Sequence, residues 1–206
     1  MEKFVRLTGT AAPLMRANID TDAIIPSRET QSVARTGYGE KLFANWRYTP
    51  GTRVEIPEFV LNQPPYRNAE ILLCGANFGC GSSREAAAWA LLQFGIRCVI
   101  AESFGGIFRN NAVRNGLLPV ALPGDAIVAI AAEIEKNGGS RITVDLERCI
   151  VEVPGGRALP FEVNGLDRAM LLEGLDEIEL TLKQKPAIEA FLTRDRSERP
   201  WVHLRR

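Results

Sequence analysis

The sequence predicts an α/β fold built around a mainly parallel sheet. Between residues 69 and 122, three short apolar runs typical of buried strands alternate with two segments of helical character. Strands that are joined by helices in this way lie parallel in one sheet and are connected by right-handed crossovers. Two further runs, separated by a charged turn, predict an antiparallel hairpin over residues 141–153.

The elements of this region are expected in close succession. The strands are expected at Ala69–Cys74, Cys98–Ala101 and Leu117–Leu122, with helices at Arg84–Phe94, before Gly116, and at Ile127–Lys136. From Arg168 to Phe191 the pattern predicts two helical stretches around Pro186. A chain of 206 residues can bury a substantial core. We therefore expect a single domain with its C-terminal helices over residues 1–195, followed by a polar tail over residues 196–206.

The segment before the sheet is less regular. A first strand is expected over residues 3–9. Pro26 favours an extended backbone at Ile25, so that the polar segment from Asn18 is expected to form a loop that enters a short extended piece. The remaining expectations are an exposed, mobile loop over 27–40, a short helix over 41–48 and a surface excursion over 50–65.

A glycine-rich turn, Asn77–Glu85, carries two hydroxyls and a guanidinium between a strand and a helix. The first N–H groups and the positive dipole end of a helix attract carboxylates and phosphates, and Arg84 offers a planar two-pronged donor. Ser82 and Glu85 also have the spacing of a capping box, in which both side chains only serve the helix. Both interpretations stay open, although a cap requires neither a second serine nor an arginine.

Asp20 and Asp22 stand in the first polar loop. Their side chains can close Asx turns and do nothing more, or they can orient an arginine of a site. The local sequence does not decide between these alternatives.

Charge and composition are those of an ordinary soluble globular protein. The chain has 25 acidic and 25 basic side chains, with 46% hydrophobic and 24% charged residues. This balance does not favour capture of nucleic acid or of an acidic membrane surface. The sequence has no apolar core of signal-peptide length and no run near the roughly 18 apolar residues of a membrane span. We expect a cytoplasmic protein with neither nucleic-acid nor membrane partners.

Cysteine and histidine usage narrows the chemistry. The four cysteines are widely spaced, and no two of them form a C-x-x-C motif. This spacing indicates reduced thiols. It predicts neither a zinc site nor a complete iron–sulfur ligand set. The single histidine, His203, lies near the end of the chain, and so a Ser-His-Asp triad is not expected. A catalytic serine would need an arginine, backbone donors or a group on another chain.

Three segments in this order, Asn18–Pro26, Gly75–Glu85 and Ser103–Pro119, resemble the small subunits of 3-isopropylmalate dehydratase in the aconitase superfamily. The resemblance implies a swivelling β/β/α three-layer domain similar to the last domain of aconitase. It also implies a partner, a separate large subunit that carries a four-iron four-sulfur cluster, and no cofactor in this chain. Enzymes of the family interconvert 2-isopropylmalate and 3-isopropylmalate, small dicarboxylates of leucine biosynthesis, by dehydration and rehydration.

The resemblance also implies roles for individual residues. By motif position Ser82 matches the catalytic base, Ser83 and Arg84 match contacts to a substrate carboxylate, and Asp22 matches a member of the polar network beside the substrate. Arg35 matches a second anion-binding arginine. The loop over the variable side group of the substrate corresponds to four residues here, Ser27, Arg28, Glu29 and Thr30.

The sequence departs from the family pattern at two places. Ala86 stands where the family usually has a histidine, and residues 27–30 are polar where the family usually has an aromatic or aliphatic pair. Two alternatives therefore stay open. One is a related hydratase for another substituted malate, such as methylmalate or dimethylmaleate. The other is a non-catalytic binding module or regulatory partner of a large subunit.

Overall fold

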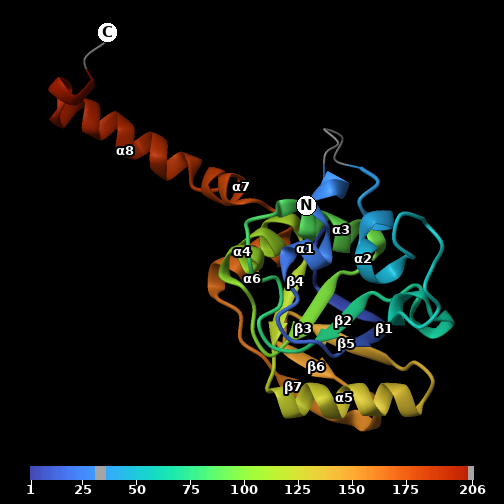
Figure 1. The fold of residues 1–206 in the computed structure, drawn as a ribbon. Coiled ribbons are helices and arrows are strands. Elements are labelled where there is room, and N and C mark those ends of the chain that lie inside the picture. The colour runs from blue at the N-terminus through green and yellow to red at the C-terminus, as the bar shows by residue number, and fades with distance from the viewer. Residues whose placement is uncertain (31–35, 204–206) are drawn as a thin grey trace. The chain divides into compact units, whose positions relative to one another are not determined.

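A computed structural model describes residues 1–30 and 36–203 of the chain. The described residues form one seven-stranded sheet with the order β4-β3-β2-β1-β5-β6-β7 (Figure 1). The strands are β1 Arg6–Leu14, β2 Ile71–Cys74, β3 Cys98–Ala101, β4 Leu118–Ala121, β5 Arg141–Asp145, β6 Ile150–Glu152 and β7 Ala158–Pro160. Strands β1 to β4 run parallel, and β5, β6 and β7 extend the sheet in antiparallel pairing. The α/β fold class is confirmed, with a mixed sheet.

Strand β1 joins the two halves of the sheet. Its residues Arg6–Thr10 pair antiparallel with β5, and Ala11–Leu14 pair parallel with β2. The first strand was expected to end at residue 9; it continues to Leu14 because its second half has its own partner. Ala11 and Ala12 are fully buried at this point, so the strand belongs to the core.

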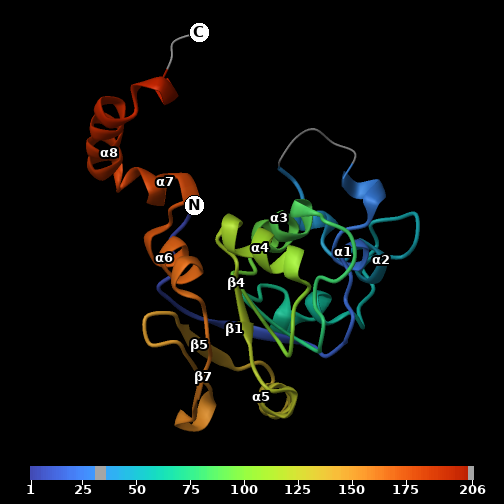
Figure 2. The ribbon, with the colours of Figure 1, turned by 90° about the vertical axis from the view of Figure 1, so that its left-hand side faces the viewer.

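Helices cover the sheet on two sides. The longer helices before residue 175 are α3 Glu85–Phe94, α4 Gly106–Asn115, α5 Gly124–Lys136 and α6 Gly165–Glu173. Figures 1 and 2 show α3 and α4 on one side of the strands and α5 on the other. The two central crossovers, β2-α3-β3 and β3-α4-β4, confirm the predicted β-α-β-α-β order. The hairpin of β5 and β6 is also confirmed, whereas β7 was not predicted.

The segment between β1 and β2 contains short helical turns. Residues Thr21–Ile24 form helix α1 where a loop was expected, and α2, Ala44–Arg47, is shorter than the predicted helix over 41–48. The structure also has short 3₁₀ turns at Ser27–Thr30, Gly39–Lys41, Val60–Asn62 and Pro64–Tyr66. The expected extended piece is therefore limited to the residues that follow α1.

The C-terminal part forms a second compact unit. The chain divides into Met1–Gly174 and Leu175–Arg206, and the second unit contains helices α7 Glu177–Leu182 and α8 Lys185–Glu198. Pro186 lies in the first turn of α8, where its missing N–H leaves no intrahelical bond unmade. Residues 196–198, expected in the polar tail, continue this helix. As a domain assignment, the boundary at residue 195 stays a prediction.

No helix within residues 1–30 and 36–203 is both long enough and apolar enough to cross a membrane. The four-residue parallel strands β2 and β3 lie at the centre of the core and are buried along their whole length.

An aromatic cluster fixes the loop after β2. The rings of Phe78 and Phe108 lie edge to face with centroids 5.1 Å apart, and Phe104 stacks against Phe108. Gly79 has a φ of +70° and packs against the same ring, because an added Cβ would lie 2.2 Å from Cγ of Phe108. This position therefore excludes a side chain for two reasons, conformation and space.

We expect Gly79→Ala to lower the free energy of unfolding far more than Gly51→Ala, which serves as the matched control. Gly51 has a φ of +74° and no atom within 4 Å of an added Cβ, so this variant should lose only about 1–2 kcal/mol from the left-handed conformation. Gly79→Ala should lose a further 1–3 kcal/mol or so from overpacking. Urea unfolding of the two variants measures the difference, and equal losses would contradict the tight contact with Phe108.

Candidate functional site

Three loops meet at the carboxyl-terminal edge of the parallel strands. They follow β1, β2 and β3, and isolated bridges join Asp20 to Cys80 and Phe78 to Phe104. Ligands of open α/β sheets bind outside this edge of the sheet. The glycine-rich turn singled out in the sequence lies in the middle loop, between the other two.

Backbone hydrogen bonds fasten the middle loop to the first. The N–H of Gly75 donates to the carbonyl of Arg16 at 3.0 Å, and the N–H of Gly79 donates to the carbonyl of Ile19 at 2.7 Å. On the other side, the N–H of Phe78 donates to the carbonyl of Ser103 at 2.9 Å. The turn is thus held by strand-like contacts on both flanks.

Two asparagines hold the first residue of the glycine-rich turn in place. Asn18 and Asn77 both have positive φ, at 54° and 59°, a conformation that asparagine adopts more readily than most residues. Nδ2 of Asn77 donates to Oδ1 of Asn18 at 2.8 Å, and the N–H of Asn77 donates to Oγ of Ser103 at 2.9 Å. Ser103 was not among the predicted site residues.

The capping-box interpretation of Ser82 and Glu85 is wrong. Helix α3 begins at Glu85, and its N-cap residue is Arg84, which makes no capping hydrogen bond with its side chain. The carboxylate of Glu85 instead accepts a hydrogen bond of 3.1 Å from Nδ2 of Asn115. Ser82 and Ser83 are exposed, and their hydroxyls have no hydrogen-bond partner among the described residues. Both hydroxyls are therefore available to a ligand.

The two aspartates of the first loop have different roles. Asp20 is the N-cap of α1, and its carboxylate accepts from the N–H of Ala23 at 2.6 Å. Asp22 forms a two-pronged ion pair with Arg84, in which Nη2 donates to Oδ2 at 2.6 Å and Nη1 donates to Oδ1. The turn interpretation thus applies to Asp20, and the arginine-orienting interpretation applies to Asp22.

The ion pair shifts the pKa of both partners toward the charged form. The hydrogen bonds from Arg84 hold the pKa of the Asp22 carboxyl below its ordinary value, and the same bonds raise the pKa of Arg84. Nη1 of Arg84 also donates to the carbonyl of Ile25 at 3.2 Å. The guanidinium is therefore fixed in place and stays charged at the start of α3.

Thr21 is a contact that the sequence did not single out. Its hydroxyl donates to the carbonyl of Ser82 at 2.9 Å, and its N–H donates to the carbonyl of Cys80 at 3.0 Å. The residue is only 2% exposed. A threonine between two aspartates is typical of an ordinary turn, and no local signal indicates a contact across 61 residues.

The predicted specificity loop forms a 3₁₀ turn, Ser27–Thr30. The N–H of Ser27 donates to Asp22 at 3.2 Å, which connects the loop to the Asp22–Arg84 ion pair. Arg35, the predicted second anion-binding arginine, lies outside the described residues.

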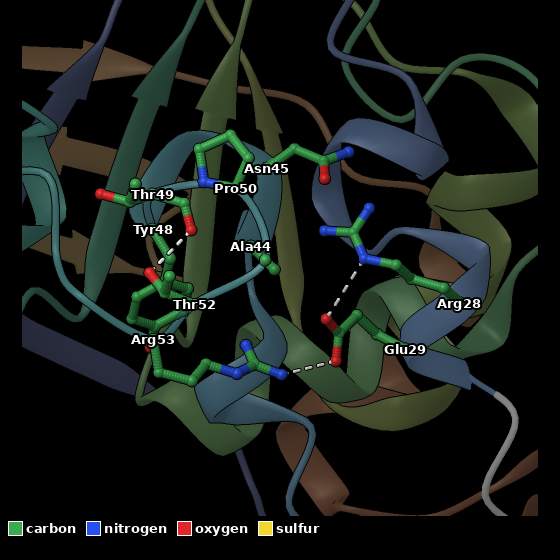
Figure 3. Close-up of a pocket in the computed structure, with 10 residues that line it drawn as sticks. Arg28, Glu29, Ala44, Asn45, Tyr48, Thr49, Pro50, Thr52 and Arg53 are labelled. Carbon is green, nitrogen blue, oxygen red and sulfur yellow. Dashed lines mark hydrogen bonds and ion pairs between the residues drawn. The ribbon is translucent and has the colours of Figure 1, made fainter.

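Arg28 and Glu29 line a pocket of about 520 Å³. Figure 3 shows Glu29 between two arginines: it binds Arg53 at 2.7 Å and lies 3.7 Å from Nε of Arg28. The remaining lining residues are Ala44, Asn45, Tyr48, Thr49, Pro50, Gly51 and Thr52. None of the residues from Ser82 to Arg84 lines this pocket, and the role of the loop in specificity stays a prediction.

Metal ligands are not gathered anywhere in the described part of the chain. Within residues 1–30 and 36–203, no group of three or more His, Cys, Asp or Glu side chains could hold a metal ion. Cys74 and Cys98 are buried, and burial raises the pKa of both thiols. The site is therefore built from hydroxyls, a guanidinium and backbone groups.

Comparisons with known proteins agree with this architecture. A family model described as the aconitase C-terminal domain matches residues 1–125, and a model described as LeuD_N matches residues 129–165. The chain is 56% identical over 206 residues to the 3-isopropylmalate dehydratase small subunit of Cupriavidus necator, covering 99% of each chain. It is 52% identical over 202 residues to that of Rhodospirillum centenum, covering 98% of this chain and 99% of the relative.

A solved structure is also similar. The crystal structure of 3-isopropylmalate dehydratase from Methanocaldococcus jannaschii matches with a TM-score of 0.65 and 27% identity, over 90% of this chain and 98% of that chain. The likeness in sequence and the likeness in structure thus point to the same kind of protein.

We expect the pKa of Asp22 to lie below its ordinary value of 3.8 and to return toward that value in Arg84→Ala. Because the folded-state pKa is lowered, the ion pair stabilises the fold above pH 3.8, and this contribution is lost as the pH falls through the folded pKa. NMR titration of the carboxyl carbons measures the change. Asp195, whose pKa is lowered by His203 and Arg199 in the second unit, should not respond. An unchanged Asp22 titration in the variant would contradict the ion pair.

Proposed function

The chain belongs to the family of 3-isopropylmalate dehydratase small subunits, and on this premise we propose that it interconverts 2-isopropylmalate and 3-isopropylmalate in leucine biosynthesis together with a large subunit. The reaction is a dehydration followed by a rehydration, which makes the protein a subunit of a hydro-lyase. The observation that supports the site assignment best is the pair of exposed hydroxyls, Ser82 and Ser83, which have no partner among residues 1–30 and 36–203 and lie beside the oriented guanidinium of Arg84.

We propose that Ser82 removes the proton from the substrate carbon next to a carboxylate. The turn from Asn77 to Glu85 contains no histidine, and in this proposal the proton acceptor there is the hydroxyl oxygen of Ser82. Proton removal builds negative charge on the substrate, and the base must itself be ionised. The Arg84 cation and the N–H groups at the start of α3 stabilise negative charge at this place.

Arg84 can bind a substrate carboxylate while it stays paired with Asp22. A guanidinium has five N–H donors. Asp22 takes one from each Nη atom and Ile25 takes the second one of Nη1. The other two donors, on Nε and Nη2, have no acceptor among the residues that the structure describes. They lie on one edge and form the side-on pair that binds a carboxylate in a two-pronged manner. In this proposal Asp22 sets the plane of Arg84, and Ser83 adds a hydroxyl contact.

In this proposal the four-iron four-sulfur cluster belongs to the partner large subunit, as the resemblance to the family implies. A Lewis-acidic iron there would accept the hydroxide that leaves the substrate. The contribution of this chain is to bind the carboxylate, to orient it and to accept the proton.

Activity should appear only when the chain is combined with a cluster-loaded large subunit. The isolated chain supplies a base and a carboxylate site but no group that takes the hydroxide, so turnover of 2-isopropylmalate should be undetectable before mixing. The measurement is the absorbance of the isopropylmaleate intermediate. Turnover of 2-methylmalate is compared in the same assay, because a hydratase for another substituted malate is the alternative. Robust turnover by the chain alone, after treatment with a chelator, would overturn the dependence on the large subunit.

Ser82→Ala should nearly abolish turnover in the combined enzyme and leave stability almost unchanged. The hydroxyl has no partner in the described structure, so its removal should alter the free energy of unfolding by no more than about 0.5 kcal/mol. Loss of a general base should lower kcat by roughly 10²- to 10⁴-fold.

Ser140→Ala, a remote change between α5 and β5, is the matched control and should keep the wild-type rate. Wild-type kcat in Ser82→Ala would remove Ser82 from the mechanism, whatever happens to the melting temperature.

A further inference from the structure

We propose that Thr21 is a positioning residue that fixes the peptide unit between Ser82 and Ser83. This inference rests on the proposed role of Ser82 as the base and adds a residue that acts through it. Thr21 lies on α1, in the loop after β1, whereas the serines lie in the loop after β2. Its side chain connects the two loops at the point where the proposed chemistry takes place.

Two hydrogen bonds from this one residue hold the turn. The N–H of Thr21 donates to the carbonyl of Cys80 at 3.0 Å, and its hydroxyl donates to the carbonyl of Ser82 at 2.9 Å. Between these two carbonyls lies Gly81 with a φ of +89°. Thr21 thus holds both ends of a backbone bend that only a glycine adopts readily.

Burial strengthens the contact to Ser82. Thr21 is 2% exposed, so that water competes little for its hydroxyl, and a hydrogen bond in such surroundings is electrostatically stronger than in water. An apolar side chain of the same shape would remove the donor and leave this partly buried hydrogen bond to the Ser82 carbonyl unmade. The hydroxyl, and not the shape of the side chain, therefore determines the direction of the carbonyl.

The hydrogen bond to this carbonyl restrains the backbone that carries both serines. A trans peptide is planar, with its C=O and N–H pointing to opposite sides. When the Ser82 carbonyl points to Thr21, the N–H of Ser83 points away from α1, and no acceptor among the described residues binds it. The orientation of this peptide plane is set by ψ of Ser82 and φ of Ser83. A change in one angle that the other does not compensate turns the two serines relative to each other, so a loosened plane would let the hydroxyls shift relative to Arg84.

The neighbours of Thr21 do not share this role. The carboxylate of Asp20 caps its own helix, and the carboxylate of Asp22 binds Arg84. Thr21 is thus the residue at the start of α1 whose side chain binds the backbone of the serine turn. Small displacements of a reacting group cost up to about 10²-fold in rate, which sets the size of the expected effect.

The test uses the enzyme combined with its large subunit and compares three variants. Thr21→Val keeps the shape and removes the hydroxyl, Thr21→Ser restores the hydroxyl, and Thr143→Val removes a hydroxyl from the Thr8–Thr143 pair in the β1–β5 ladder. We expect kcat for 2-isopropylmalate to fall about 10- to 100-fold in Thr21→Val. KM should change less than kcat, because Arg84, the charged contact to the carboxylate, is held by Asp22 and not by Thr21. Thr21→Ser should recover most of the rate, and Thr143→Val should keep all of it.

A merely structural role predicts a different pattern. In that case kcat would follow the melting temperature, and Thr21→Val with wild-type kcat would overturn the proposal, as would equal losses of kcat in Thr21→Val and Thr143→Val. If Thr21→Val does not fold, Thr21→Cys, a weak donor, replaces it and should give an intermediate kcat. Ser82→Ala is measured in parallel. A fully active Ser82→Ala contradicts the proposed function, whereas an inactive Ser82→Ala beside a fully active Thr21→Val contradicts only the positioning role.

Discussion

Strand β1 is paired on both of its edges, and the site depends on the way this strand divides its partners. Its first half pairs antiparallel with β5 and its second half pairs parallel with β2. The parallel half ends level with β2, so the loop after Leu14 emerges beside the loop after Cys74. Residues far apart in the chain can then exchange backbone hydrogen bonds, and the bridge between Asp20 and Cys80 continues the strand pairing into the two loops.

The site itself combines rigid backbone with few side chains. Aromatic packing at Phe78 and Phe108, the asparagine pair at the entrance and the helix start at Glu85 each restrict one part of the turn. The ion pair of Asp22 and Arg84 then orients the guanidinium at the start of α3. The hydroxyls of the turn are left exposed, which is the arrangement expected where a substrate, or a second protein chain, completes the surroundings.

The sequence predicted those parts of the fold that local patterns determine. Strands β2 and β3, helix α3 and the hairpin of β5 and β6 have clear apolar periodicity and were expected close to their observed bounds. The length of β1 was underestimated because its second half is specified by β2, some 60 residues away. The prediction of a capping box was wrong for a similar reason, because the partner of Glu85 is distant in the sequence: its carboxylate binds Asn115 of the next helix. The contact of Thr21 was not predicted because its partner is the backbone of a distant loop.

The two outermost strands of the sheet, β4 and β7, are only four and three residues long. Each contains a proline, Pro119 in β4 and Pro160 in β7. Proline has no N–H to offer to an incoming strand, and short edges present few donors and acceptors for one. The sheet is thus protected at both edges against growth by strand addition, and copies of the chain are kept from fibril-like association with one another.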